Sequence, residues 1–507
     1  MKKRMKRITA LAMTGLLVAG CLTACGPKEK AGEHNSAKDI EINYWQAGLG
    51  REWLDNIVAA FEEKYPEYNV HINASASNAS VIAPFGLETE DTVDLYLATT
   101  NRQTEYMEPL NDILEEIADG DTKPLKEKFN QEYLEMEKFG DNYYHLTYGG
   151  GNIGFVYNKA LFEQAGIKQV PRTTDELALT CSTLNDNSIK PLIHFKTAGY
   201  YHFTDQVWFA QYNGYDSWRD FYINPTKDKM MEKDGRYEVL KVHEKLNTGE
   251  NVVVGSNSEN AINMQTKFLE GQAAIMVTGS WLENEMRYQG KMNDFAMMKT
   301  PVISSIVDKL TTVKKDKDLR NLVTAIDKVT DGEVNIDTYK DGENYKIDNL
   351  VVSAADWEYV KAARAMTANN YAGETCFIPN YSNAKEGAKK FLQFLFSDEG
   401  YKIYADTIHL GMPLSLSEGT IDTSKWSEFA QNQFRILSET ENGIYNSFTG
   451  AHELFFTGGG DAFAHITYVN KMCTMYEDDR QTADDIWKTI TQTIDERYDN
   501  TWMKNIK

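Results

Sequence analysis

The sequence predicts an α/β protein in which strands and helices alternate along the chain. Ile40, Ile42 and Tyr44 alternate with polar residues, which indicates a strand with one buried face. Two more short apolar runs, at 70–72 and 93–98, follow after an intervening helical pattern and are predicted as strands. A strand–helix–strand–strand rhythm of this kind is typical of a largely parallel sheet covered by helices.

The first predicted helix is defined by apolar residues at helical spacing, and Pro66 ends it. Those apolar residues are Trp53, Leu54, Ile57, Val58 and Phe61. A further strand is predicted at 153–157, with a helix around 159–165, and longer amphipathic helices at 383–396 and 482–497. Residues 307–350 are rich in Lys and Asp, and we predict an insertion there with a short helix at 318–329.

The first 26 residues have the pattern of a secretory signal peptide. Five Lys and Arg residues precede an apolar run at 8–20, and Leu22-Thr23-Ala24-Cys25-Gly26 follows it. The run is shorter than the roughly 20 residues that span a bilayer. The segment resembles the lipobox of bacterial lipoproteins, which implies a signal peptide at 1–24 and a lipid on Cys25. Val18-Ala19-Gly20-Cys21 also fits this pattern, so Cys21 is the alternative lipid site.

The composition is that of an acidic globular protein with a large core. The chain has 507 residues, 42% of them hydrophobic, and a net charge of −22. An acidic surface opposes binding to nucleic acid and to anionic lipid headgroups. We therefore expect the N-terminal lipid to be the sole contact with a membrane, joined to the first lobe by a flexible tether at 25–39. Cys181, Cys376 and Cys473, the cysteines outside the leader, lack the spacing of a metal site, and we expect no cofactor and no bound metal.

Several sequence motifs occur in a fixed order and together extend over nearly the whole chain after residue 40. They are Ile42-Asn43-Tyr44-Trp45, Asp94-Leu95-Tyr96-Leu97-Ala98, Gly154-Phe155-Val156-Tyr157-Asn158-Lys159, Phe268-Leu269-Glu270-Gly271-Gln272-Ala273-Ala274-Ile275-Met276 with Gly279-Ser280-Trp281, and Ala388-Lys389-Lys390-Phe391 with Gly411-Met412-Pro413. No single motif is specific, but the ordered set resembles that of the family 1 extracellular solute-binding lipoproteins that serve ABC-type sugar importers. Thr174 stands where that family usually has Trp, which indicates a divergent branch.

This resemblance implies a periplasmic-binding-protein-like fold of type II, in which a hinge joins two α/β lobes and a ligand cleft lies between them. We predict that 40–156 and 296–396, with the insertion at 307–350, form lobe 1, and that 157–295 and 397–507 form lobe 2. The implied protein is a monomer anchored at the extracellular face of a bacterial, Gram-positive-type membrane. It would capture a carbohydrate, with an oligosaccharide favoured, and deliver it to the permease subunits of an ABC transporter.

Candidate ligand-binding residues follow from the chemistry of sugars and from the loops after predicted strands. Sugar C–H faces stack on aromatic rings, and sugar hydroxyls bind planar polar side chains. In the family, the Trp that ends the fourth motif commonly faces the ligand, which makes Trp281 the leading candidate. The predicted set is Trp281, Trp45, Tyr148, Tyr201, Asn101, Asn152, Gln46 and Glu283. Trp53, Trp208 and Trp487 lie at helical spacing with other apolar residues and are predicted to be core residues.

Other functions of the same fold stay open at this stage. A sensory co-receptor, an adhesin or a receptor for a non-sugar solute would have the same motifs. A surface glycosidase is disfavoured, since the sequence has no H-E-x-x-H, G-x-S-x-G or Cys/His nucleophile signature and its nine histidines are scattered. A pair of catalytic carboxyls leaves no such signature. We therefore predict a binding protein that is not an enzyme.

Overall fold

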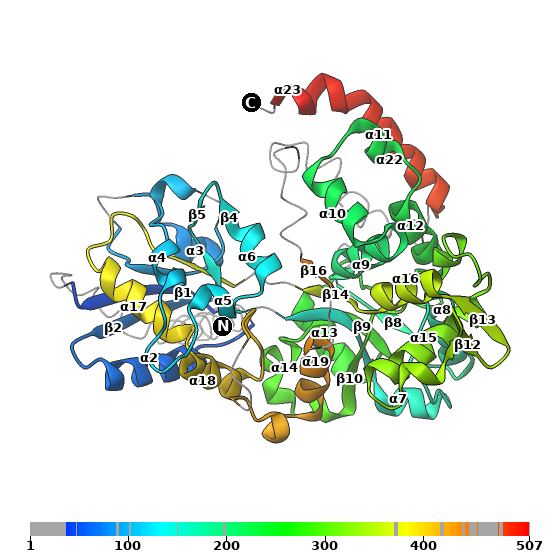
Figure 1. The fold of residues 1–507 in the computed structure, drawn as a ribbon, viewed down its shortest axis with the longest axis horizontal. Coiled ribbons are helices and arrows are strands. Elements are labelled where there is room, and N and C mark those ends of the chain that lie inside the picture. Colours follow the sequence, from blue (N-terminus) through cyan, green and yellow to red (C-terminus); the bar gives the residue numbers. More distant parts are fainter. Residues whose placement is uncertain are drawn as a thin grey trace, which may run out of the picture.

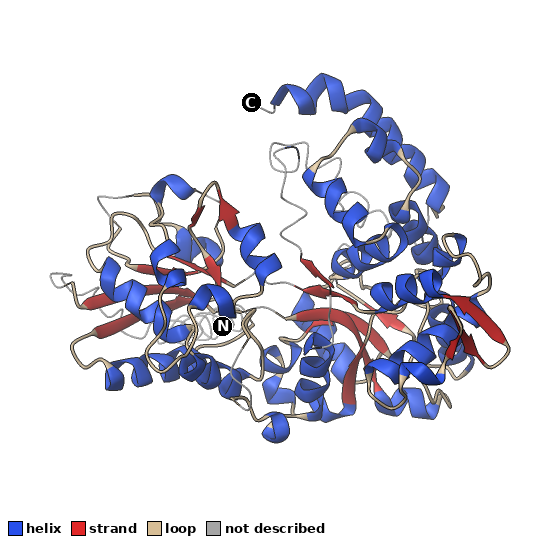
Figure 2. Ribbon diagram, in the orientation of Figure 1, coloured by secondary structure: helices blue, strands red, loops and turns tan. Residues whose placement is uncertain are grey.

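The computed structural model shows two lobes side by side, each built around its own sheet (Figure 1). It describes residues 37–505 except 47, 88–90, 101–102, 150, 196–198, 370–373, 416–419, 439–441, 446–453, 455–474 and 476–479. Figure 2 shows strands at the centre of each lobe and helices packed around them. The predicted arrangement of two α/β lobes is confirmed.

The first lobe has a five-stranded sheet in the order β2-β1-β3-β15-β6. Its strands are β1 (Asp39–Trp45), β2 (Asn69–Ser75), β3 (Leu95–Leu97), β6 (Leu146–Thr147) and β15 (Thr375–Phe377). β1 is parallel to β2 and β3, whereas β15 is antiparallel to its neighbours β3 and β6. Consequently the carboxyl ends of β1, β2, β3 and β6 share one edge with the amino end of β15.

Helices cover the first sheet on both sides, and their apolar faces form its core. In α2, the residues predicted from helical spacing are all buried, and Trp53 donates a hydrogen bond to the Tyr44 hydroxyl at 2.8 Å. The helix ends at Lys64, two residues before Pro66, so the predicted end is confirmed. The helices are α2 (Glu52–Lys64), α3 (Asn78–Ile82), α4 (Asn111–Glu115), α5 (Leu125–Lys128), α6 (Gln131–Glu137), α17 (Lys385–Leu395) and α18 (Asp398–Ile408), and a short hairpin, β4 (Lys138–Phe139) and β5 (Asn142–Tyr143), follows α6.

The second lobe has a six-stranded sheet in the order β16-β14-β7-β9-β8, with β10 also paired to β7. Its strands are β7 (Asn152–Asn158), β8 (Leu192–Ile193), β9 (Ile275–Gly279), β10 (Phe295–Met298), β14 (Met366–Asn369) and β16 (Asn442–Tyr445). β7 runs antiparallel to β9, β10 and β14. The amino end of β7 therefore lies at the same edge as the carboxyl ends of β9 and β14.

The helices of the second lobe carry most of the predicted core tryptophans. Trp208 on α9 and Trp487 on α22 are buried, and both are confirmed as core residues. Thr482 and Asp485 form a reciprocal capping box at the start of α22. The helices are α7 (Lys159–Gln164), α8 (Thr174–Asp186), α9 (Tyr201–Asn213), α10 (Tyr215–Ile223), α11 (Lys227–Met231), α12 (Gly235–Leu246), α13 (Ala261–Leu269), α14 (Leu282–Glu285), α15 (Asp316–Thr330), α16 (Ala354–Arg364), α19 (Glu428–Ser438), α22 (Ala483–Arg497) and α23 (Met503–Asn505).

The predicted insertion at 307–350 is an added layer on the second lobe. It contains α15, at the position of the predicted helix, and two strands of a separate three-stranded sheet. That sheet consists of β11 (Lys340–Asp341), β12 (Asn344–Ile347) and β13 (Leu350–Ser353). Tyr345 stacks on Trp357 of α16, with ring centroids 4.4 Å apart, so the small sheet is held against the helix by an aromatic pair.

The strand pairing places the boundaries between the two lobes at other residues than those predicted. β7 belongs wholly to the second sheet, and β10 pairs with β7, so 152–156 and 296–369 were wrongly assigned to lobe 1. α18 packs on α2 of the first lobe, so 398–408 was wrongly assigned to lobe 2. The apolar spacing within an element does not encode its sheet partner, and this is the physical reason for the errors. The signal peptide at 1–24 lies outside the described residues, as does all of the tether at 25–39 except its last three residues.

Two further findings concern cysteines and membranes. Cys181 and Cys376 are buried free thiols, and Cys473 lies outside the described residues. No helix in the described part of the chain combines the length and apolar character needed to cross a membrane.

Candidate functional site between the lobes

The two lobes meet at the sheet edges described above, because the chain crosses between them there. It passes directly from β6 to β7, later from β14 to β15, and again between α18 and α19 (Figure 1). Gly149 and Gly151 lie on the first of these crossings. We call the contact zone at these facing edges the seam.

Trp281 belongs to an aromatic pair on the second lobe's side of the seam. It lies two residues after the end of β9 and is 9% exposed. Its indole lies across Gly279, where a Cβ would stand only 2.3 Å from the ring. Tyr200, at the start of α9, meets the indole edge-on, with centroids 5.3 Å apart and an interplanar angle of 81°. The glycine thus leaves room for the indole to lie across the end of the strand.

Glu374 and Tyr148 lie together on the first lobe's side. The Tyr148 amide donates to the Glu374 carbonyl at 2.9 Å, and the Tyr148 ring stacks on Trp53 at 5.3 Å. Tyr148 is fully buried, and its hydroxyl has no hydrogen-bond partner among the described residues; the same holds for Oε2 of Glu374, a residue that is 8% exposed. Burial raises the pKa of Glu374 to about 7, and the negative charge of Glu285 adds to this effect.

Glu285 lies on α14 of the opposite lobe. Its Oε2 accepts a hydrogen bond from Gln265 at 2.8 Å, and burial raises its pKa. A Cβ on Gly48, in the turn after β1, would lie 2.9 Å from the Glu285 side chain. The neighbouring Asn284 donates to the carbonyl of Ile408 on α18 at 2.9 Å. α14 is therefore one of the elements through which the second lobe contacts the first.

A cluster of buried amides and one hydroxyl continues the seam along the crossing. Asn152 donates to the Gln433 carbonyl at 2.7 Å, which ties the start of β7 to α19. Its Oδ1, the Gln433 Oε1 and the Ser280 hydroxyl have no hydrogen-bond partner among the described residues. Buried polar atoms normally have partners, and the missing ones here indicate a place where a ligand or water would supply them.

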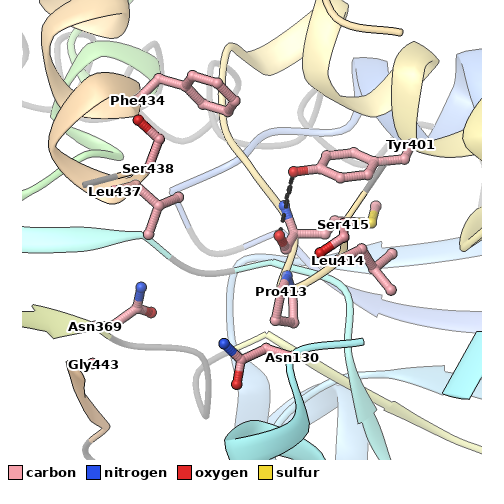
Figure 3. A pocket seen from close by; sticks show the side chains of 11 residues that line it. Asn130, Asn369, Tyr401, Pro413, Leu414, Ser415, Phe434, Leu437, Ser438 and Gly443 are labelled. Atoms are coloured by element: carbon pink, nitrogen blue, oxygen red, sulfur yellow. Dashed lines mark hydrogen bonds between the residues drawn. The ribbon is translucent and has the colours of Figure 1, made fainter. Parts of the chain in front are cut away.

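A cavity of about 400 Å³ opens beside this cluster, lined from both lobes (Figure 3). Tyr401 holds the loop on the first lobe's side, since its hydroxyl accepts from the Met412 amide at 2.8 Å. Asn369, at the end of β14, has an Oδ1 that is buried and without a partner in the described part of the chain. The cavity is lined by Asn130, Asn369, Tyr401, Met412, Pro413, Leu414, Ser415, Phe434, Leu437, Ser438 and Gly443.

The structure brings three of the predicted site residues to the seam, namely Trp281, Tyr148 and Asn152. Trp45 and Gln46 lie at the end of β1, where the Trp45 indole donates to the Ala76 carbonyl at 3.2 Å. Glu283 accepts from the Ser427 hydroxyl at 2.8 Å, and Asn101 lies outside the described residues.

Tyr201 is buried against Phe155 and His243 inside the second lobe, and its neighbour Tyr200 contacts Trp281 instead. Sequence reasoning missed Glu285 and Glu374 altogether. Glu285 lies two residues beyond a predicted residue, on the same short helix, and this proximity was the available signal. Glu374 directly precedes β15, and nothing in its local sequence distinguishes it from the many other acidic residues of the chain.

Comparison with solved structures shows that the fold is the two-lobed, type II periplasmic-binding-protein-like fold. The bacterial solute receptor AcbH, which has an exclusive preference for β-D-galactopyranose, superposes with a TM-score of 0.62 at 12% identity, covering 92% of this chain and 98% of that one. RafE, solved in complex with raffinose, superposes with a TM-score of 0.57 at 14% identity, covering 90% and 99%.

The chain belongs to the bacterial extracellular solute-binding protein family, whose model matches residues 47–402. Among curated proteins it is similar to the galactooligosaccharide-binding protein of Bacillus subtilis, at 24% identity over 55% of this chain and 64% of that protein. It is also similar to the xylose/arabinose-binding protein XacG of Haloferax volcanii, at 23% identity over 50% of this chain and 55% of that protein. The chain thus spans less than two thirds of the length of either relative.

Proposed function

We propose that this protein is the substrate-binding component of an ABC transporter and captures a carbohydrate, with an oligosaccharide favoured, between its lobes. One observation carries the proposal: an aromatic pair, Trp281 and Tyr200, stands at the seam beside buried polar atoms that have no hydrogen-bond partner among the described residues. Aromatic faces and polar acceptors side by side are what a sugar requires of its site. The relatives named above, which bind galactooligosaccharides, raffinose and pentoses, support the same class of ligand.

The proposed mechanism is closure of the lobes upon the ligand. A sugar that contacts Trp281 on one lobe and Tyr148 on the other stabilises the closed arrangement by its greater affinity for that state. The permease would then recognise the closed form. The protein would act as a monomer without a cofactor, bind no nucleic acid and catalyse no reaction.

Isothermal titration of the purified protein with mono- and oligosaccharides tests the proposal, with chromatography of the ligand afterwards. We expect binding by at least one glycan, and about a tenfold or greater weakening of that binding in Trp281→Ala, the effect of losing a stacking aromatic. Trp487→Phe is the control, because that residue packs against Tyr237 far from the seam. Heat with peptides or polyols but with no glycan would sink the sugar assignment, and a cleaved product would sink the binding function.

We further propose that a lipid on Cys25 holds the protein at the extracellular membrane face. A tethered receptor works at raised effective concentration near its permease. Labelling of cells with a fatty-acid analogue tests this assignment. Cys25→Ser is expected to abolish the label, and Cys21→Ser to retain it; the opposite result would assign the lipid to Cys21.

A further inference from the structure

The second sheet has two faces, and the aromatic pair at the seam lies on the face that α9 covers. In an antiparallel ladder, residues directly opposite each other point to the same face. Gly279 of β9 lies opposite Ile153 of β7, and Phe155, two residues further along β7, shares this face. The Phe155 ring packs on Trp208 of α9, with centroids 5.6 Å apart. Because the Trp281 indole occupies the place of a Cβ on Gly279, it lies on the α9 side of the sheet.

The cavity of about 400 Å³ lies on the other face of this sheet, which α19 covers. Asn369 of β14 lies opposite Asn152, the first residue of β7, and this pair points to the face opposite to that of the next residue of β7. The Asn152 side chain donates to the carbonyl of Gln433 on α19 at 2.7 Å. Asn369 lines the cavity together with Phe434 and Leu437 of α19. The sheet therefore separates the cavity from the aromatic pair.

The cavity is uncharged and has both polar and apolar walls. None of the eleven described residues that line it is Asp, Glu, Lys, Arg or His. Asn369 is 2% exposed, and its Oδ1 has no hydrogen-bond partner among the described residues, which indicates a place for a ligand donor. Pro413, Leu414, Phe434 and Leu437 supply apolar surface around it (Figure 3). A charged ligand would lose its hydration here without meeting an opposite charge.

We propose that this cavity is a second ligand site, separate from the aromatic pair, and that it binds a neutral sugar of monosaccharide size. One hydroxyl of the sugar would donate to Asn369 Oδ1, and a C–H face would lie against the Phe434 ring. The volume is at the lower end of the roughly 300–1,000 Å³ typical of small-molecule sites, which favours a single ring over a chain. Ser415 and Ser438, both exposed, offer further hydroxyls at its rim. The proposal goes beyond oligosaccharide capture at Trp281 and does not depend on it.

Occupancy of the cavity would also be linked to the spacing of the lobes, because both lobes line it. Tyr401 and Met412 belong to the first lobe's side, whereas Phe434 and Leu437 belong to α19 of the second. The chain joins the lobes from β6 to β7 and from β14 to β15, and bending there would bring the lobes together on one face of the sheet and separate them on the other. The sugar in the cavity would then have different contacts in the open and closed states, which couples the two sites.

Titration calorimetry with four monosaccharides tests the second site, using neutral D-glucose and D-galactose against charged glucosamine and glucuronic acid. We expect at least one neutral sugar to bind Trp281→Ala with an affinity within about twofold of the unaltered protein. Asn369→Leu removes the acceptor, and Ser438→Phe places a ring in the cavity, so each should weaken this binding by about tenfold or more. Both charged sugars should bind about tenfold or more weakly than the neutral one.

Two measurements separate loss of the site from loss of the fold. Asn369→Leu should leave the thermal midpoint of unfolding unchanged or raised, because it removes a buried polar atom without a partner in the described structure. Ser182→Phe on α8 is the matched control for Ser438→Phe and should leave sugar binding unchanged. Like Ser438, Ser182 is an exposed serine whose hydroxyl donates to a backbone carbonyl of its own helix.

Loss of neutral-sugar binding in Trp281→Ala would assign the sugar to the aromatic pair and overturn the second site. Binding of none of the four sugars, or equal binding of the charged ones, would overturn it as well and leave oligosaccharide capture at Trp281 intact. For an oligosaccharide bound at Trp281, a saturating neutral monosaccharide should change the affinity by about threefold or more, and Ser438→Phe should abolish this change. An unchanged affinity in the unaltered protein would overturn the coupling between the sites.

Discussion

Two buried carboxyls in this protein, Asp356 and Glu374, differ in their hydrogen-bond partners and in the direction of their pKa shifts. They are 3% and 8% exposed, so both are withdrawn from water. Asp356, in the first turn of α16, accepts hydrogen bonds from three successive backbone amides, those of Thr311, Thr312 and Val313. Oε2 of Glu374, at the seam, accepts none in the described structure.

The pKa shifts follow this difference. Burial acts to raise the pKa of Asp356, but hydrogen bonds from the Thr312 and Thr311 side chains and amides outweigh it, and the net shift is downward. The pKa of Glu374 rises to about 7, since burial and the charge of Glu285 act in the same direction. Asp356 links the added layer to α16 of the second lobe, whereas Oε2 of Glu374 has no hydrogen-bond partner among the residues that the structure describes.

The largest expected effect is the loss of the carboxylate that the protein does partner. Asp356→Ala removes the shared acceptor of the Thr311, Thr312 and Val313 amides, and each hydrogen bond to a charged group contributes about 1.5–3 kcal/mol. We expect the free energy of unfolding to fall by about 3 kcal/mol or more, measured by urea denaturation. Asp356→Asn should cost less, because its amide oxygen still accepts. Glu358→Ala, exposed on the same helix, should stay within about 0.5 kcal/mol of wild type; equal losses in both would contradict our assignment.

Glu374 should make the stability depend on pH in the sense opposite to an ordinary carboxylate. Its pKa is raised from 4.5 to about 7 on folding, so the folded state holds the proton more tightly. Stability from this group is present below pH 4.5 and is lost as the pH rises through 7, by on the order of 3 kcal/mol. The difference in unfolding free energy between wild type and Glu374→Gln, followed from pH 5 to pH 8, isolates this contribution. Parallel curves would show that Glu374 titrates normally.

Some features of the fold could be predicted from the sequence alone, and others could not. Alternation in β1 and helical spacing in α2 are local signals, and both elements were predicted at their observed positions. The choice of lobe for 296–369 depends on β10 pairing with β7, a contact between residues more than a hundred positions apart. Local spacing cannot carry that information, and the lobe boundaries were therefore wrong.

The candidate site shows the same limit at the scale of single residues. Trp281 was found because it ends a recognisable motif at a strand terminus. Tyr201 was predicted at the site, but its neighbour Tyr200 lies there instead. The reason is that Tyr201 packs on Phe155 inside the lobe, and this packing sets the direction of the side chains at the start of α9. Glu374 acquires its properties from Glu285 and from burial, which exist only once the two lobes meet.

A smaller effect on stability is expected when alanine replaces a glycine at the seam, compared with the same change at the surface. A Cβ on Gly151, at the crossing from β6 to β7, would lie 1.7 Å from the Ser280 hydroxyl oxygen, whereas a Cβ on Gly249 would meet nothing within 4 Å. Gly151→Ala should therefore cost about 1–3 kcal/mol, and Gly249→Ala should stay within about 0.5 kcal/mol of wild type. Adding Ser280→Ala to Gly151→Ala removes the closest atom and should restore part of the loss, which a double-mutant cycle by thermal unfolding measures. Equal stability of the two single variants would mean that the crossing tolerates a side chain and that the seam is looser than these contacts indicate.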